Sequence, residues 1–148
     1  MKYPVALALF LVVLSLAACS KDQLSVDKLE GAWNVVSKKV YLDDIDQQDT
    51  SLNGQTITYS FETCDLKAVD FCDGNIHTMQ DTSHNDSPMI YQFGDAGNTL
   101  VIDYDGDVNT TNDRITAVVT KLSKDEFIFE YEVTITQTQR TVLTLNKQ

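Results

Sequence analysis

The sequence predicts an all-β protein, an eight-stranded antiparallel up-and-down barrel with a short N-terminal helical turn. The chain has 148 residues, 43 % of them hydrophobic, with six Tyr, six Phe and one Trp. That is enough for one domain with a packed core. From residue 32 onward apolar side chains recur at every second position, which is typical of strands. The connections are short, which favours a closed barrel without exposed edges over a sandwich of the same strands.

The first 18 residues are typical of a removable export signal. Lys2 precedes an apolar run over residues 5–18. As a helix this run would rise about 21 Å, well short of the roughly 30 Å hydrocarbon core of a bilayer. A charged start, a short apolar run and small residues before the break therefore indicate a secretory signal and not a permanent span.

The run ends in Leu16-Ala17-Ala18-Cys19, which resembles the lipobox of bacterial lipoproteins. The resemblance implies that the Cys19 sulfur receives diacylglycerol, that cleavage occurs before Cys19, and that the new amino terminus is acylated, typically with palmitate. Two or three acyl chains hold a protein firmly in a membrane, whereas one holds it marginally. The alternative is an ordinary signal peptide with an incidental cysteine.

This resemblance implies an organisation and a location. We expect a lipoprotein signal peptide over 1–18, a lipidated tether over 19–25 and the barrel domain over 26–148. The protein would lie in the bacterial cell envelope. Ser20 lacks the acidic character that retains lipoproteins at the inner membrane in some bacteria, so the outer membrane is favoured, with its face left open.

The barrel domain can be divided into elements in chain order. Residues 25–30 can form one helical turn, with Ser25 as its N-cap and Gly31 as its end. Eight strands bounded by turn residues are then predicted. They cover residues 32–42, 55–64, 74–81, 88–93, 98–104, 114–122, 126–133 and 139–147.

The entry to the first strand, Leu29-Glu30-Gly31-Ala32-Trp33, resembles the opening of lipocalins and lipocalin-like domains. The resemblance implies that Trp33 plugs the closed end of the barrel and that Gly31 lets the backbone pass beneath it. Lys147 would stand in for the basic residue, usually Arg, that covers this Trp through a cation–π contact. The corner at 123–125 lacks the Thr-Asp-x-x-Tyr pattern of the core lipocalins, so the chain is most similar to the shorter lipocalin-like domains of bacterial lipoproteins.

Cys64 and Cys72 remain once Cys19 is set aside, and an even pair in an oxidising compartment predicts a disulfide. Closing a nine-residue loop would stabilise the fold by roughly 2–3 kcal/mol. A reactive or metal-binding pair is the alternative, although the Cys-x-x-Cys spacing is absent.

Alternate loops of an up-and-down barrel share an end, so four loops should form its open mouth. These are residues 43–54, 82–87, 105–113 and 134–138, which together contain eight acids and no Lys or Arg. The acids are Asp43, Asp44, Asp46, Asp49, Asp86, Asp105, Asp107 and Asp113. Such a mouth focuses negative potential and disfavours a carboxylate or phosphate at the entrance. Ordinary surface solubility is the alternative explanation.

Aromatic residues recur at positions expected to face the barrel interior. They are candidates for binding a small apolar ligand: Tyr59, Phe61, Tyr91, Phe93, Tyr104, Phe127, Phe129 and Tyr131. An eight-stranded barrel can hold one small ligand or be filled outright by side chains, and so many large rings slightly favour a filled core.

Metal and cofactor sites are not expected. Asp103, Asp105, Asp107 and Asn109 alternate as in calcium loops, but the Gly position is wrong and Arg114 stands where a bidentate Glu belongs. We interpret 103–113 as a solvated hairpin loop, with calcium as the alternative. The spacing of His77 and His84, the only two histidines, matches no familiar zinc motif.

The function predicted is non-catalytic binding. No catalytic or nucleotide-binding signature occurs. Without Lys2 the mature chain has ten basic against 22 acidic residues, a formal charge of −12 that disfavours nucleic acid as a partner. We expect a small neutral or cationic apolar ligand in the barrel or at its mouth. The alternative is a protein-interaction module, an inhibitor or an accessory subunit of an envelope complex, with a filled core.

Overall fold

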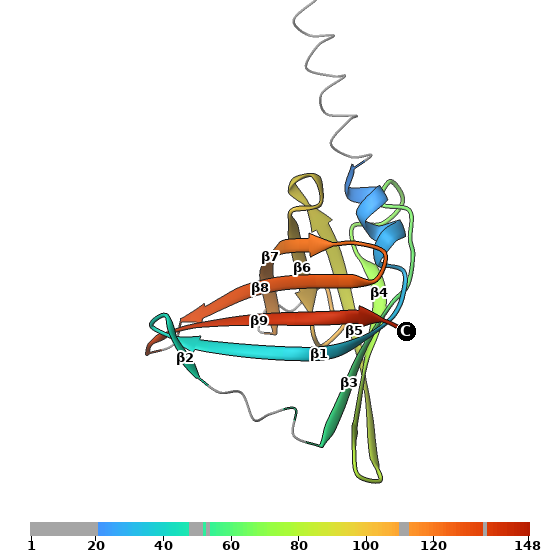
Figure 1. Cartoon of the computed structure of the whole chain (residues 1–148). Coiled ribbons are helices and arrows are strands. Elements are labelled where there is room, and N and C mark those ends of the chain that lie inside the picture. Colours follow the sequence, from blue (N-terminus) through green and yellow to red (C-terminus); the bar gives the residue numbers. More distant parts are fainter. Residues whose placement is uncertain (1–20, 48–51, 53, 110–112, 135) are drawn as a thin grey trace, which may run out of the picture.

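A computed structural model describes residues 21–47, 52, 54–109, 113–134 and 136–148, and it contains a closed antiparallel β-barrel (Figure 1). Each strand pairs with the next one along the chain, and β1 also pairs with β9, which closes the sheet. The eight barrel strands are β1 (Gly31–Leu42), β3 (Gln55–Phe61), β4 (Cys72–Gln80), β5 (Ser83–Gly94), β6 (Thr99–Asp103), β7 (Arg114–Leu122), β8 (Glu126–Thr134) and β9 (Thr138–Lys147). The predicted eight-stranded up-and-down barrel is confirmed.

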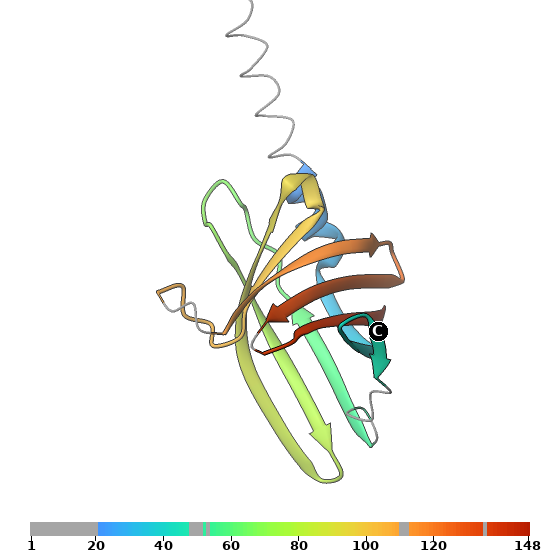
Figure 2. The ribbon, with the colours of Figure 1, turned by 90° about the vertical axis from the view of Figure 1, so that its left-hand side faces the viewer.

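Two short elements accompany the barrel strands. β2 (Ile45–Gln47) folds back on the end of β1, with Leu42 opposite Ile45. A 3-10 turn, η1 (Asp95–Gly97), joins β5 to β6. The loops therefore alternate between two ends, and the end that receives the N-terminal helix is the closed end (Figure 2).

A helix over residues 21–29 packs on the closed end, so the expected single turn is longer than predicted. Two of its own residues, Val26 and Leu29, are fully buried. Ser25 is not the N-cap: it lies inside the helix, and its hydroxyl donates to the Lys21 carbonyl one turn earlier. The Asp22 carboxylate accepts a hydrogen bond from the Gly97 backbone N–H at 2.7 Å. Residues 21–25, expected in a polar tether, are thus held against the barrel.

β5 begins five residues before its expected start at residue 88. The polar segment 83–87, predicted as a mouth loop, instead continues the ladder with β4 as far as the pair Gln80 and Ser83. The turn is reduced to two residues, and Asp81 adopts the left-handed conformation, φ 53°, that Asp tolerates. Asp86 consequently lies in a strand, with its carboxylate 2.5 Å from His77 Nδ1 on β4. β3 in turn ends at Phe61, three residues earlier than predicted.

Trp33 lies at the closed end of the barrel and is fully buried. Its indole Nε1–H donates to the Leu29 carbonyl at 2.6 Å, which ties the helix to the first strand. Lys147 Nζ lies 5.2 Å from the centre of the Trp33 ring. Gly31 has φ +112°, and a side chain there would also approach Lys147. The end of the last strand thus covers the tryptophan from outside.

A β-bulge in β1 sets which of its side chains face inward. In β1 the register shifts between Val35 and Ser37, so Lys38 and Val40 lie opposite Leu143 and Thr141 of β9. Cross-strand partners share a face of the sheet. Because Leu143 and Thr141 are buried in the barrel, the inner face of β1 beyond the bulge carries Lys38, Val40 and Leu42.

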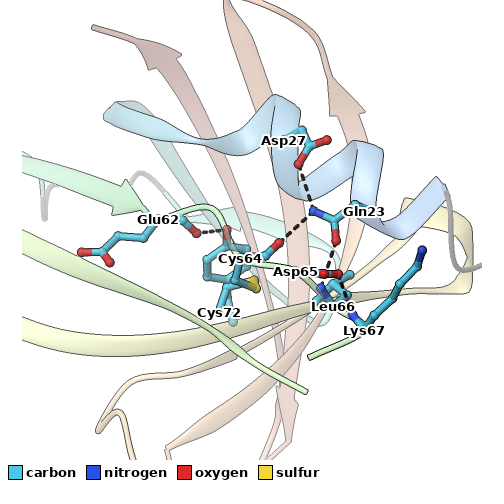
Figure 3. The surroundings of a disulfide bond; sticks show 9 residues. Gln23, Asp27, Glu62, Cys64, Asp65, Leu66, Lys67 and Cys72 are labelled. Atoms are coloured by element: carbon cyan, nitrogen blue, oxygen red, sulfur yellow. Dashed lines mark hydrogen bonds between the residues drawn. A yellow bond between two sulfur atoms is a disulfide. The ribbon is translucent and has the colours of Figure 1, made fainter. Parts of the chain in front are cut away.

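The segment 62–71 between β3 and β4 is fixed at the closed end by a disulfide and by Gln23 (Figure 3). Cys64 and Cys72 are bonded, with their Cα atoms 5.4 Å apart. The Gln23 amide donates to the Cys64 carbonyl at 2.8 Å and to Asp27, and its oxygen accepts from the Leu66 N–H at 2.9 Å. The helix, the disulfide and this segment therefore form one connected unit.

Candidate ligand site in the barrel

The closed half of the barrel is filled by aromatic rings. Phe61 and Tyr91 lie 5.0 Å apart between ring centres, and Phe127 and Phe129 lie 5.1 Å apart. Further ring contacts of 6.0–6.4 Å connect these four to Trp33, Tyr59 and Phe93. Six of the eight aromatic candidates, Tyr59, Phe61, Tyr91, Phe93, Phe127 and Phe129, thus pack on one another as core. Their first role is to hold the strands together.

The other two candidates, Tyr104 and Tyr131, extend this core toward the mouth and bring hydroxyl groups with them. The Tyr104 hydroxyl lies 3.5 Å from that of Tyr59. Tyr131 is opposite Thr141 on β9 and has its side chain as a hydrogen-bond partner. We call the hydroxyl groups of Tyr59, Tyr104, Tyr131 and Thr141 the tyrosine floor.

Burial keeps the tyrosine floor uncharged. Loss of solvent raises the pKa of Tyr59 to about 12, with Tyr104 acting against that rise and Tyr131 adding to it. Burial likewise raises the pKa of Tyr104 well above its ordinary value, and that of Tyr131 in spite of Thr141. Phenol groups in this environment remain protonated and can both donate and accept hydrogen bonds.

Apolar side chains above the tyrosine floor face inward but are only half-buried. The register places them on the inner faces of four strands, and they are Val40, Leu42, Ile57, Ile76 and Ile115. Incomplete burial of inward-facing apolar residues indicates that the mouth half is less tightly filled than the closed half. We call this region, walled by these residues and ending at the tyrosine floor, the mouth chamber.

The strands around the mouth chamber separate from one another. β1 and β3 pair only from Gly31 to Asn34, and β5 and β6 pair only from Ile90 to Gly94. Beyond these points the outer part of the β4–β5 hairpin diverges from β1 and β9 (Figure 1). The mouth chamber thus lies at the end opposite the N-terminal helix (Figure 2).

Lys38 is a site residue that the sequence did not reveal. The bulge in β1 puts it on the inner face, opposite Leu143, and it is half-buried there. Simple alternation from Trp33 would have placed Lys39 inward instead. Lys38 also has an interaction partner within the protein.

The acidic residues predicted for the mouth are present there, but they are partly neutralised. Asp43 and Asp44 form the exposed tip after β1, and Asp46 lies in β2. The prediction considered the charges of the loops alone and therefore left out Arg140 and Arg114, which lie near strand ends beside the same loops. Arg140 lies 3.2 Å from Glu130 and 3.8 Å from Asp44.

The remaining candidates of the mouth form a self-bonded turn. Asp105 accepts a hydrogen bond from the N–H of Asp107, which in turn accepts from Asn109. In the part of the chain that the structure describes, no three His, Cys, Asp or Glu residues are grouped to hold a metal ion. Asp49 and Cys19 lie outside the described residues.

A second concavity lies on the outside of the barrel. This outer groove has a volume of about 620 Å³ and is lined by residues 66–71, Asp73, Ile90, Gly106 and Val108. Val69 and Val108 are 44 % and 54 % exposed. Beside it, the Arg114 guanidinium lies 5.2 Å from the Phe71 ring and donates at 2.8 Å to the buried Asp103. The groove thus combines apolar side chains with the carboxylates of Asp70 and Asp73.

Comparisons with solved structures agree with this fold. Bovine odorant-binding protein in complex with a selenium-containing odorant superposes with a TM-score of 0.51 at 15 % identity, over 83 % of this chain and 72 % of that one. The same bovine protein with undecanal gives 0.50 at 15 % identity, over 82 % and 72 % of the two chains. A redesigned β-barrel gives 0.50 at 15 % identity, over 84 % and 95 %.

These neighbours include lipocalin-type barrels, so the resemblance expected from Gly31 and Trp33 holds at the level of fold. No family model matches the sequence, and no curated protein matches it significantly. Among the described residues, no helix is long and apolar enough to cross a membrane.

Proposed function

We propose that the protein is a non-catalytic binding protein that takes a small neutral or cationic apolar ligand into the mouth chamber. The observation that carries the proposal is a change of environment along the barrel axis. On the closed-end side of the tyrosine floor, aromatic rings are packed with their centres 5.0–6.4 Å apart. On the mouth side of the floor, the inward-facing apolar residues are half-buried between strands that separate. Bovine odorant-binding protein, a neighbour in fold, has been observed with undecanal and with its natural ligand.

The charge around the mouth supports a ligand without negative charge. Asp43, Asp44 and Asp46 surround the β1 tip, and the whole chain carries a formal charge of −11. A carboxylate approaching this end would be repelled, whereas a neutral or cationic group would not.

The test uses the full chain carrying Cys19→Ser and an apolar fluorescent probe. We expect saturable uptake that the substitution Ile57→Asp, on the wall of the mouth chamber, abolishes. Ile128→Asp on the outer face of β8 is the matched control and should leave uptake unchanged. Absence of uptake by the folded protein, or native mass spectrometry that recovers mainly fatty acids, would contradict the proposal.

We further propose that Cys19 anchors the protein in the bacterial envelope, at the outer membrane. The supporting observation is the sequence Leu16-Ala17-Ala18-Cys19 at the end of an apolar run. Growth with an alkyne-labelled palmitate should label the native chain but not the Cys19→Ser variant. Equal labelling of both chains, or none of either, would refute the anchor.

The outer groove favours a second function, a protein-interaction module of the envelope. Val69 and Val108 are exposed in a groove that also contains Phe71, and two acids, Asp70 and Asp73, line it against one base, Lys67. These features suit an apolar segment with basic residues from a partner protein. Two results together would favour this function over ligand carriage. The protein would take up no probe, and it would bind a stable partner that Val69→Asp loses and Val118→Asp retains.

A further inference from the structure

Among the residues that the structure describes, Tyr59 and Tyr104 bond to each other through their hydroxyl groups, which uses one of the two phenolic hydrogens. The hydroxyls of Tyr59 and Tyr104 lie 3.5 Å apart, and only one of them can donate to the other. Each phenol has one hydrogen and two acceptor positions, so the second hydrogen of the pair needs another acceptor. Tyr131 is directed to Thr141, which also accepts from the Gln139 amide at 3.4 Å.

Tyr104 is the member of the pair that a ligand would meet. Tyr59 is 6 % exposed and packs between Phe61 and Phe129 in the aromatic core. Tyr104 is only half-buried, follows the last residue of β6 and stands at the loop side of the floor. Tyr104 therefore stands at the boundary between the packed core and the mouth chamber.

We propose that the Tyr104 hydroxyl donates a hydrogen bond to an uncharged oxygen, such as a carbonyl or ether oxygen, of the apolar ligand. This inference rests on the proposed ligand function and names the chemical class of its ligand. The neutral floor offers a donor but no cation, and the inward cation, Lys38, has a partner of its own. A hydrogen bond made in an apolar chamber discriminates strongly between a ligand that can accept it and one that cannot.

The test compares four molecules with the same chain length, by competition against a fluorescent probe bound to the Cys19→Ser chain. They are methyl nonyl ketone, undecane, undecanoate and undecylammonium. We expect the ketone to bind roughly tenfold more tightly than the alkane, which corresponds to one hydrogen bond. Tyr104→Phe should remove this preference while leaving the affinity for undecane unchanged.

Tyr41→Phe is the matched control, because Tyr41 loses the same hydroxyl on the outer face, where its ring packs on Arg140 at 4.3 Å. It should retain the preference for the ketone. Equal binding of ketone and alkane by the native chain, a preference that survives Tyr104→Phe, or tightest binding of undecanoate would overturn the inference. Either of the first two results leaves the proposed function standing if the probe is taken up. Tightest binding of undecanoate, or failure of every apolar molecule to bind, overturns both the inference and the proposed function.

Discussion

At the scale of single residues, Trp33 connects three parts of the chain. It binds the Leu29 carbonyl through Nε1, contacts Phe127 edge-on at 6.0 Å, and is covered by Lys147. Trp33→Phe would leave a buried carbonyl unpaired and open a small cavity. We expect a loss of about 2–4 kcal/mol in the free energy of unfolding, measured by denaturant titration.

Lys147→Met should cost less than about 1 kcal/mol, because an exposed cation contributes little over a ring. Lys124→Met, also at the closed end, should have no measurable effect. A larger loss for Lys147→Met than for Trp33→Phe would show that the cation, and not the indole hydrogen bond, secures the closed end.

The buried phenols predict alkaline destabilisation. Tyr59 has a pKa of about 12 in the folded state, against 10.0 when it is solvated. The folded state therefore holds this proton more tightly than the unfolded state. The resulting stability is complete below pH 10 and is lost as the pH rises through 12, by about 2–3 kcal/mol.

Denaturant titrations at pH 9 and above pH 11 would measure this loss, with phenolate absorbance reporting the ionisation. In Tyr59→Phe the alkaline loss should shrink. An unchanged loss in that variant would assign the effect to the other buried tyrosines.

At the scale of elements, the disulfide fixes the segment 62–71 to β4. Replacing Cys64 and Cys72 together by alanine should lower the free energy of unfolding by about 2–3 kcal/mol, because the closed loop is short. The same loss should appear in the native chain under reducing conditions, by denaturant titration. Reduction should leave the double variant unaffected, which separates loop closure from other effects of the reductant.

The bulge in β1 is the element that alternation alone does not predict. The sequence predicted the strands, their order and the apolar side of most of them, because period two and turn residues are local signals. It could not predict that one extra residue near Val36 moves Lys38 inward and Lys39 outward. Likewise, the polar half of β5 is a strand only because β4 pairs with it, and Arg140 neutralises acids of a loop that is distant in sequence.

Deleting Val36 tests the bulge directly. Without the extra residue, alternation from Trp33 would be regular, with Ser37 outward and Lys38, Val40 and Leu42 still inward, in register with β9. We expect the deletion variant to fold, with only a modest fall in the unfolding midpoint measured by denaturant titration. Val36→Ala is the control: the side chain is 52 % exposed, so the change should stay within about 0.5 kcal/mol. A deletion variant that fails to fold would mean that the bend or twist which the bulge gives β1 is itself required.

At the scale of the whole molecule, charge and topology act together. The up-and-down connection brings the acidic tip at 43–46 and the loop at 105–107 to the end through which the mouth chamber opens. The N-terminal helix, which follows the proposed anchor, lies at the other end (Figure 2). An anchored protein would thus present an acidic entrance away from its point of attachment.

This arrangement predicts electrostatic steering at the entrance. The association rate of undecylammonium should fall as ionic strength rises, whereas that of methyl nonyl ketone should not change, because only the cation is attracted and the attraction is screened over about 10 Å at 0.1 M salt. Stopped-flow displacement of a fluorescent probe measures both rates. Replacing Asp43, Asp44 and Asp46 by Asn should abolish most of the salt dependence, whereas Asp125→Asn at the closed end should preserve it. If the triple variant keeps the full salt dependence, the charge at the tip does not guide entry, and Arg140 with its acidic partners neutralises it.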